Sequence, residues 1–82
     1  MTDPYKLAME IAKEVERARS LWPAINTAHE GIAVIREEYL ELEEEVFKKQ
    51  TEYDRAAMRK EAIHVAAMGM RFILDVLDKE GQ

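Results

Sequence analysis

The chain has 82 residues, no cysteine and a formal net charge of −5, from 12 basic and 17 acidic side chains. Its length allows a single small domain, residues 1–82, whose limited buried fraction favours association with further copies. The lack of cysteine excludes disulfides and thiolate sites, and the acidic balance argues against direct binding of nucleic acid. The N-terminus does not resemble a signal peptide, and no apolar run is long enough to span a bilayer. We therefore expect a cytoplasmic protein without membrane contact.

The composition predicts an all-α protein, because glycine and proline are few and strong helix formers dominate. The first helix should begin with Asp3 as N-cap and Pro4 at its first position. Pro23 should end this helix, since the residue before a proline is pushed out of the helical region. Steps of three and four residues define its apolar stripe, which comprises Ala8, Ile11, Val15, Ala18 and Trp22.

A second helix should begin at Thr27, where "TAHE" has the spacing of a capping box. Its main apolar stripe comprises Ala28, Ile32, Ile35, Tyr39, Leu42 and Val46. A weaker apolar line on another face comprises Ala33, Leu40 and Phe47. Two apolar faces require two packing partners, and we expect one of them to be another subunit.

The third helix should run from Asp54 to Lys79 or Glu80, with Gly81 as its C-cap. Its apolar arc is so wide that it leaves only a narrow polar sector, made of Lys60, His64, Arg71, Asp75 and Asp78. A helix of this kind belongs in the centre of a bundle. We therefore expect three-helix chains to form a helical bundle by dimerisation or tetramerisation around the second and third helices.

Glutamates crowd the second helix in "REEYLELEEEV", residues 36–46. Glu38, Glu41 and Glu45 share one face, where like charges repel by about 0.2–0.5 kcal/mol per pair unless a cation lies among them. Glu61 stands at the edge of the apolar arc of the third helix, where a charge without a partner is costly. Packed antiparallel, the two helices could bring Glu61 near Glu38 and Glu41, and such oxygen ligands suit Mg²⁺ or Mn²⁺.

The spacing also fits a solvated charged face, with Lys48, Lys49 and Lys60 as counter-charges. Glu43 and Glu44 point away from the apolar stripe and are expected to face water.

Two short motifs resemble those of the MazG-like, all-α nucleoside triphosphate pyrophosphohydrolases. "EEYLE", Glu37–Glu41, matches the EExxE motif of that family, and "EAIH", Glu61–His64, stands where the family has ExxD. The similarity covers roughly residues 27–75. It implies a helical dimer or tetramer that uses Mg²⁺ to hydrolyse a nucleoside triphosphate to a nucleoside monophosphate and pyrophosphate.

The same resemblance implies roles for individual residues. Glu38, Glu41 and Glu61 would be metal ligands, with His64 in the fourth position, and Glu37 would support these ligands or orient the attacking water. The ions would neutralise phosphate charge and lower the pKa of that water. Candidates for holding the phosphates are Lys48, Lys49, Lys60 and Arg59.

His64 is a departure from the family, which has aspartate at this position. Imidazole is a poor ligand for Mg²⁺, although Mn²⁺, Fe²⁺ or Zn²⁺ would accept it. Asp75 cannot replace the missing aspartate, because eleven helical residues put it about 16 Å along the axis. The resemblance therefore implies an active site that is altered in metal preference, weakened or lost.

Other interpretations of these residues stay open. "EAIH" is also a Glu-x-x-His pair of the kind found in di-iron and di-manganese carboxylate bundles. His64 in the polar sector is equally consistent with a surface or interface residue, and the chain with a non-catalytic, regulatory helical dimer. Trp22 and Tyr39 are expected to pack in the core, and His29 to lie on the surface.

Overall fold

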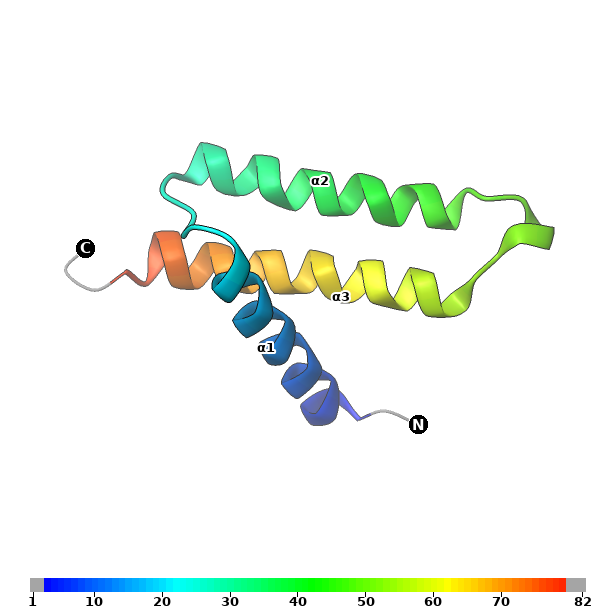
Figure 1. Cartoon of the computed structure of the whole chain (residues 1–82), viewed down its shortest axis with the longest axis horizontal. Helices are drawn as coiled ribbons and strands as arrows, with labels where there is room; N and C mark the ends of the chain where they lie inside the picture. The colour runs from blue at the N-terminus through cyan, green and yellow to red at the C-terminus, as the bar shows by residue number, and fades with distance from the viewer. Residues whose placement is uncertain (1–2, 80–82) are drawn as a thin grey trace.

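In the computed structural model, which describes residues 3–79, the chain forms three α-helices and no strand within that range. Regular helix covers α1 (Pro4–Leu21), α2 (Ala28–Val46) and α3 (Arg55–Phe72). A 3₁₀ turn, Gln50–Glu52, precedes α3, and a π-helical turn, Ile73–Leu77, follows it. Helices α2 and α3 lie side by side and antiparallel, while α1 crosses α3 at a steep angle (Figure 1). None of the described helices is both long and apolar enough to cross a membrane.

All three predicted helix starts are confirmed by side-chain caps. The Asp3 carboxylate accepts a hydrogen bond from the Lys6 amide at 2.8 Å. Thr27 Oγ1 accepts one from the Glu30 amide at 3.1 Å, and Asp54 accepts one from the Ala57 amide at 3.0 Å. Each cap satisfies an amide that has no partner inside its helix, which explains why these residues set the starts.

The helix ends follow the sequence less closely. Trp22 is extended, with φ −127° and ψ 149°, as expected for the residue before Pro23. The prediction of a regular third helix to Lys79 or Glu80 is wrong, because α3 ends at Phe72 and the π turn ends at Leu77. The Asp78 amide there donates to the Ile73 carbonyl, five residues back, at 2.7 Å. Glu80 and Gly81 lie outside the described residues.

The hydrophobic core of the single chain is small. Its buried members are Val15, Ala18, Ile25, Ala67 and Met68. The predicted packing of Trp22 and Tyr39 in this core is wrong, since they are 63% and 51% exposed. Trp22 leaves the α1 stripe because it has already left the helix, and Tyr39 lies on a side of α2 that α1 and α3 leave uncovered.

In α3 and its π turn, some residues predicted to be exposed are buried, and some predicted to be buried are exposed. Arg71 and Asp75, expected in the polar sector, are only 3% and 4% exposed. By contrast Ile73 and Leu77, from the apolar arc, are 47% and 58% exposed. The polar side chains turn inward because the linker between α1 and α2 offers them partners, which leaves apolar side chains on the outer side.

That linker, residues 22–27, is held by a buried polar network. The Asp75 carboxylate accepts from Arg19 Nη2 at 2.8 Å and from the Ile25 amide at 3.1 Å. Arg71 Nη2 donates to the Pro23 carbonyl at 2.8 Å and lies 3.5 Å from Asp75 Oδ2. Two cationic side chains around one carboxylate therefore fix the linker against the C-terminal end of α3.

Gly31, in the first turns of α2, is buried where that helix meets α3. A Cβ there would overlap the Phe72 ring, coming within 2.6 Å of Cε2. We expect Gly31→Ala to lower the free energy of unfolding by about 1–3 kcal/mol, because the ring must leave its place. Urea denaturation measures this change.

Gly69 offers the matched control, because it is also helical but has nothing within 4 Å of an added Cβ. Gly69→Ala should stabilise the protein by about 0.5–1 kcal/mol through helix propensity alone. Equal effects of the two substitutions would contradict a close contact between α2 and Phe72.

Candidate metal centre

The antiparallel pair of α2 and α3 brings the four predicted ligands together. Glu38 and Glu41 stand three residues apart on α2, and Glu61 and His64 stand three residues apart on α3, so each pair shares one helix face. One ligand atom from each residue can be chosen so that all four lie within 4.8 Å of one another. This set can hold a metal ion, with three carboxylates and one imidazole as ligands.

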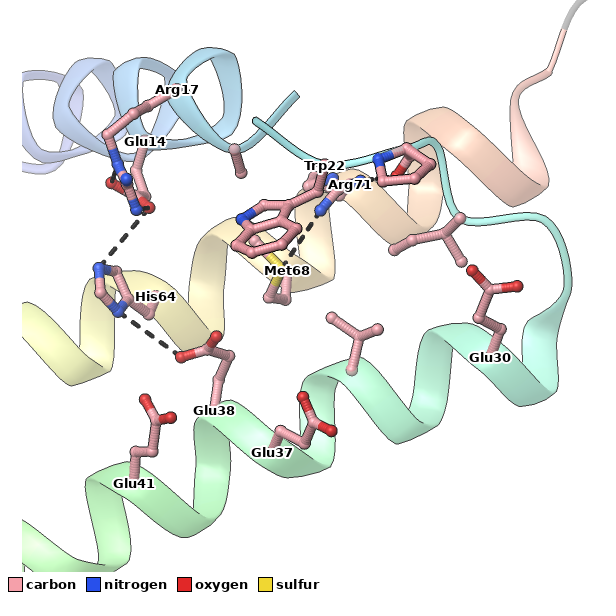
Figure 2. A pocket seen from close by; sticks show the side chains of 14 residues that line it. Glu14, Arg17, Trp22, Glu30, Glu37, Glu38, Glu41, His64, Met68 and Arg71 are labelled. Atoms are coloured by element: carbon pink, nitrogen blue, oxygen red, sulfur yellow. Dashed lines mark hydrogen bonds and ion pairs between the residues drawn. The ribbon is translucent and has the colours of Figure 1, made fainter. Parts of the chain in front are cut away.

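His64 lies among the three helices and is partly buried, so it is not a fully exposed surface residue. Its side chain is 18% exposed, and Nδ1 lies 3.6 Å from Glu38 Oε2 and 3.6 Å from Glu61 Oε2. On its other side, Nε2 lies 3.6 Å from Glu14 Oε2. Figure 2 shows the ring between Glu14 of α1 and Glu38 of α2.

Two carboxylate oxygens of this cluster are buried without a donor. Glu38 Oε2 and Glu61 Oε2 have no hydrogen-bond partner among the described residues. A buried carboxylate oxygen normally has a partner, and leaving it without one is costly. A cation placed among the four ligands would satisfy both atoms at once.

Burial and repulsion between neighbouring carboxylates favour the protonated forms of Glu38 and Glu61. The pKa of Glu38 is raised, mainly by burial and then by the negative charge of Glu41. Burial also raises the pKa of Glu61, with a further contribution from its close approach to the Glu41 carboxyl group. The His64 ring acts in the opposite direction on both groups. A divalent cation would reverse these shifts by replacing the protons.

The spacing of the ligands is close to what an ion requires. In an octahedral shell with bonds of about 2.1 Å, neighbouring ligand atoms lie about 3 Å apart. The 3.6 Å separations around His64 Nδ1 exceed this by less than about 1 Å.

A cavity of about 460 Å³ opens beside the cluster. Glu37, Glu38 and Glu41 line its acidic end. The rest of its lining mixes apolar side chains, among them Trp22, Val34 and Met68, with the charged Glu30 and Arg71. Figure 2 shows the Trp22 indole above Met68.

Of the other residues predicted to take part in the site, some line the cavity and others lie away from it. Glu37 is exposed and lines the cavity, as its predicted role requires. Lys48 instead pairs with Glu45 at 2.7 Å, and neither Lys48 nor Lys49 lines this cavity. Lys60 borders an adjoining hollow, which it shares with His64.

The other two glutamates of the acidic run are solvated to different degrees. Glu44 is exposed, as predicted, whereas Glu43 is half-buried.

Three residues at the site were not predicted from the sequence: Glu14, Arg17 and Arg71. Arg17 donates to both oxygens of Glu14, at 2.9 and 2.7 Å. The pKa of Glu14 is lowered, chiefly by this hydrogen bond. The available signals were weak: Glu14 directly precedes the core residue Val15, and Arg71 lies four residues before Asp75 on a largely apolar helix.

No family model, curated protein or solved structure matches this chain. The arrangement of the residues themselves is therefore the basis for a functional proposal. Its chemistry is that of a hard, anionic ligand set with one nitrogen donor, beside a cavity lined by both charged and apolar side chains.

Proposed function

We propose that the protein is a metal-dependent nucleoside triphosphate pyrophosphohydrolase, similar to the MazG-like enzymes. The proposal is carried by one observation: ligand atoms of Glu38, Glu41, Glu61 and His64 lie within 4.8 Å of one another. These are four of the five positions that the two short motifs supply, from helices separated by a loop; the fifth is Glu37. The reaction hydrolyses a phosphoanhydride bond and yields a nucleoside monophosphate and pyrophosphate.

The four clustered residues would hold a divalent cation, Mg²⁺ or Mn²⁺. When bound, the ion neutralises phosphate charge and lowers the pKa of a bound water. Glu37 lies on the cavity wall one residue before Glu38, where its exposed carboxylate can accept a proton from water or orient it.

The cavity suits a nucleotide in size and polarity. Its volume of about 460 Å³ falls within the usual range of small-molecule sites, about 300–1,000 Å³. The exposed Trp22 indole on the cavity wall offers a face for stacking a nucleobase. Arg17, which lines the cavity, and Lys60, which borders the adjoining hollow, are the cationic side chains best placed to contact phosphates.

We also propose that the working form is a homodimer or tetramer built on α2 and α3. The single chain exposes 6422 Å², whereas a compact monomer of this mass exposes about 5,000 Å². Its radius of gyration is 14.0 Å, against about 11.7 Å for a compact chain of this length. Both comparisons, together with exposed apolar side chains such as Ile32, Phe47 and Leu77, favour cover by a second copy.

A non-catalytic helical dimer is the alternative, and the exposed apolar surface is compatible with it. A non-catalytic dimer would not explain why one buried oxygen of Glu38 and one of Glu61 have no hydrogen-bond donor among the described residues. A di-metal carboxylate site would need a second Glu61–His64 pair from another copy of the chain, and it is less favoured because Glu38, Glu41, Glu61 and His64 already gather within one chain.

Pyrophosphate release from a panel of nucleoside triphosphates, with Mg²⁺ or Mn²⁺, tests the proposal. Glu38→Gln should lower the rate at least about 100-fold, because it removes a charged ligand that supports the transition state. Glu44→Gln, an exposed glutamate on the same helix, is the matched control and should leave the rate unchanged. Undetectable release with every nucleotide, or full activity of Glu38→Gln, would refute the assignment.

A further inference from the structure

We infer that His64 binds the ion through Nδ1 while Glu14 holds the ring by accepting the Nε2 proton, and that this arrangement makes the site selective for first-row transition ions over Mg²⁺. The inference rests on the proposed function only in so far as the same cluster holds an ion. It concerns His64, where this chain departs from the motif pattern, and Glu14, which lies outside both motifs.

The two nitrogens of His64 face different surroundings. Nδ1 is directed at the cluster, 3.6 Å from oxygens of both Glu38 and Glu61. Nε2 is directed away from it, 3.6 Å from Glu14 Oε2. A neutral imidazole carries one proton, so an ion at Nδ1 requires that the proton stay on Nε2, where Glu14 can accept it.

Glu14 is itself held in place by α1. Arg17, one turn further along that helix, donates to both of its oxygens at 2.9 and 2.7 Å. The Glu14 side chain is 15% exposed, so little water competes for the Nε2 proton. A shift of about 0.6 Å would bring Nε2 and Oε2 to ordinary hydrogen-bond distance. Arg17 thus fixes the Glu14 carboxylate, and this carboxylate faces His64 Nε2 on the side of the ring that points away from the cluster (Figure 2).

A carboxylate beside the second nitrogen of a ligating histidine affects how that histidine binds a metal ion. A histidine that ligates a metal usually donates its other N–H to a carboxylate or carbonyl, which fixes the ring and makes the ligating nitrogen more basic. Mg²⁺ gains little from a nitrogen ligand, whereas Co²⁺ and Zn²⁺ gain much more. Glu14 is thus a positioning residue that raises the affinity of the site for metal ions that bind well to nitrogen ligands.

Calorimetric titration of the full-length, metal-free protein with Co²⁺ and with Mg²⁺ tests the inference. Transition ions bind most sites more tightly than Mg²⁺, so the reference is His64→Asp, which replaces the imidazole by a carboxylate. We expect the Co²⁺-to-Mg²⁺ affinity ratio to fall at least tenfold in His64→Asp. Glu14→Gln should weaken Co²⁺ binding about tenfold with a smaller effect on Mg²⁺.

Glu16→Gln makes the same charge change on an exposed residue of α1 and should leave both affinities unchanged. In the Zn²⁺-loaded protein, ¹⁵N spectra of His64 should show the proton on Nε2. Unchanged affinity ratios in both His64→Asp and Glu14→Gln, or a proton on Nδ1 with Zn²⁺ bound, would overturn this inference alone. Failure of every ion to bind would overturn it together with the proposed function, which the release of pyrophosphate tests separately.

Discussion

Replacing Asp75 by alanine is expected to lower the free energy of unfolding by about 3–5 kcal/mol, the effect of leaving a buried charge without its partner. The Asp75 side chain is 2% exposed and lies among Arg19, Arg71 and the Ile25 amide. Arg71, whose side chain is 4% exposed, would lose its carboxylate partner and keep only its bond to the Pro23 carbonyl. Urea denaturation followed by circular dichroism measures the loss.

Asp78, three residues later and exposed, provides the control. Asp78→Ala should change the free energy of unfolding by no more than about 0.5 kcal/mol. A loss of less than about 1 kcal/mol in Asp75→Ala would show that the network does not hold the linker in the way its distances indicate.

The contribution of Asp75 also has a defined pH dependence. Burial favours the neutral form of this group, but the hydrogen bonds from Ile25 and Arg19 outweigh it and lower the pKa below 3.8. A group whose pKa is lowered on folding stabilises the protein above its unfolded pKa and loses that contribution as the pH falls through the folded value. The difference between wild type and Asp75→Ala should therefore be constant above about pH 5 and shrink under strongly acidic conditions.

Replacing Glu61 by glutamine is expected to stabilise the metal-free protein at neutral pH and to abolish its stabilisation by metal. The Glu61 carboxylate is crowded by its neighbours and has a buried oxygen without a donor, so neutralising it removes repulsion. In the wild type, an ion at 100 times its dissociation constant should add about 2.7 kcal/mol. For a domain of this size that corresponds to a rise of about 10–20 °C in the melting temperature. Thermal unfolding with Mg²⁺, Mn²⁺ or Co²⁺ measures both effects.

The pH dependence of the metal-free protein follows from the raised pKa values of Glu38 and Glu61. A group whose pKa is raised on folding contributes stability below its unfolded pKa, and that contribution is lost as the pH rises through the folded value. The metal-free protein should therefore lose stability as the pH rises above 4.5, the ordinary value for glutamate. Stabilisation by the ion should grow over the same range, because the ion competes with protons for the carboxylates.

Glu44→Gln is again the appropriate control, since it lies on the exposed side of α2. It should keep the full metal-induced rise in melting temperature. A Glu61→Gln protein that still gains several degrees from the ion would mean that the ion binds elsewhere.

The Asp75 network and the glutamate cluster have different roles: the first supports the fold, and the second is the proposed metal site. The Asp75 network sets two guanidinium groups around one carboxylate, leaving Arg71 Nε without an acceptor among the described residues, and it holds the linker that carries Trp22 to the edge of the cavity. The glutamate cluster has buried oxygens that lack donors. A site of this kind lowers the stability of the metal-free protein and gains stability when an ion binds.

Local chemistry allowed much of the secondary structure to be predicted. The caps at Asp3, Thr27 and Asp54 act within a few residues of themselves, and Pro23 restricts only the residue before it. The same locality explains why Glu38 and Glu41 could be placed on one helix face, because residues three apart share a face in any fold, whereas His64 became a candidate ligand through the motif resemblance.

Only the tertiary structure decided which faces turn inward and which partners meet. The inward position of Arg71 and Asp75 depends on backbone groups of the linker, Pro23 and Ile25, some 50 residues away in the chain. The approach of Glu14 to His64 likewise depends on the angle at which α1 crosses α3, which helical periodicity does not specify. The sequence by itself therefore determined the helices, their starts and the candidate ligands, whereas packing between distant segments determined the surroundings of those ligands.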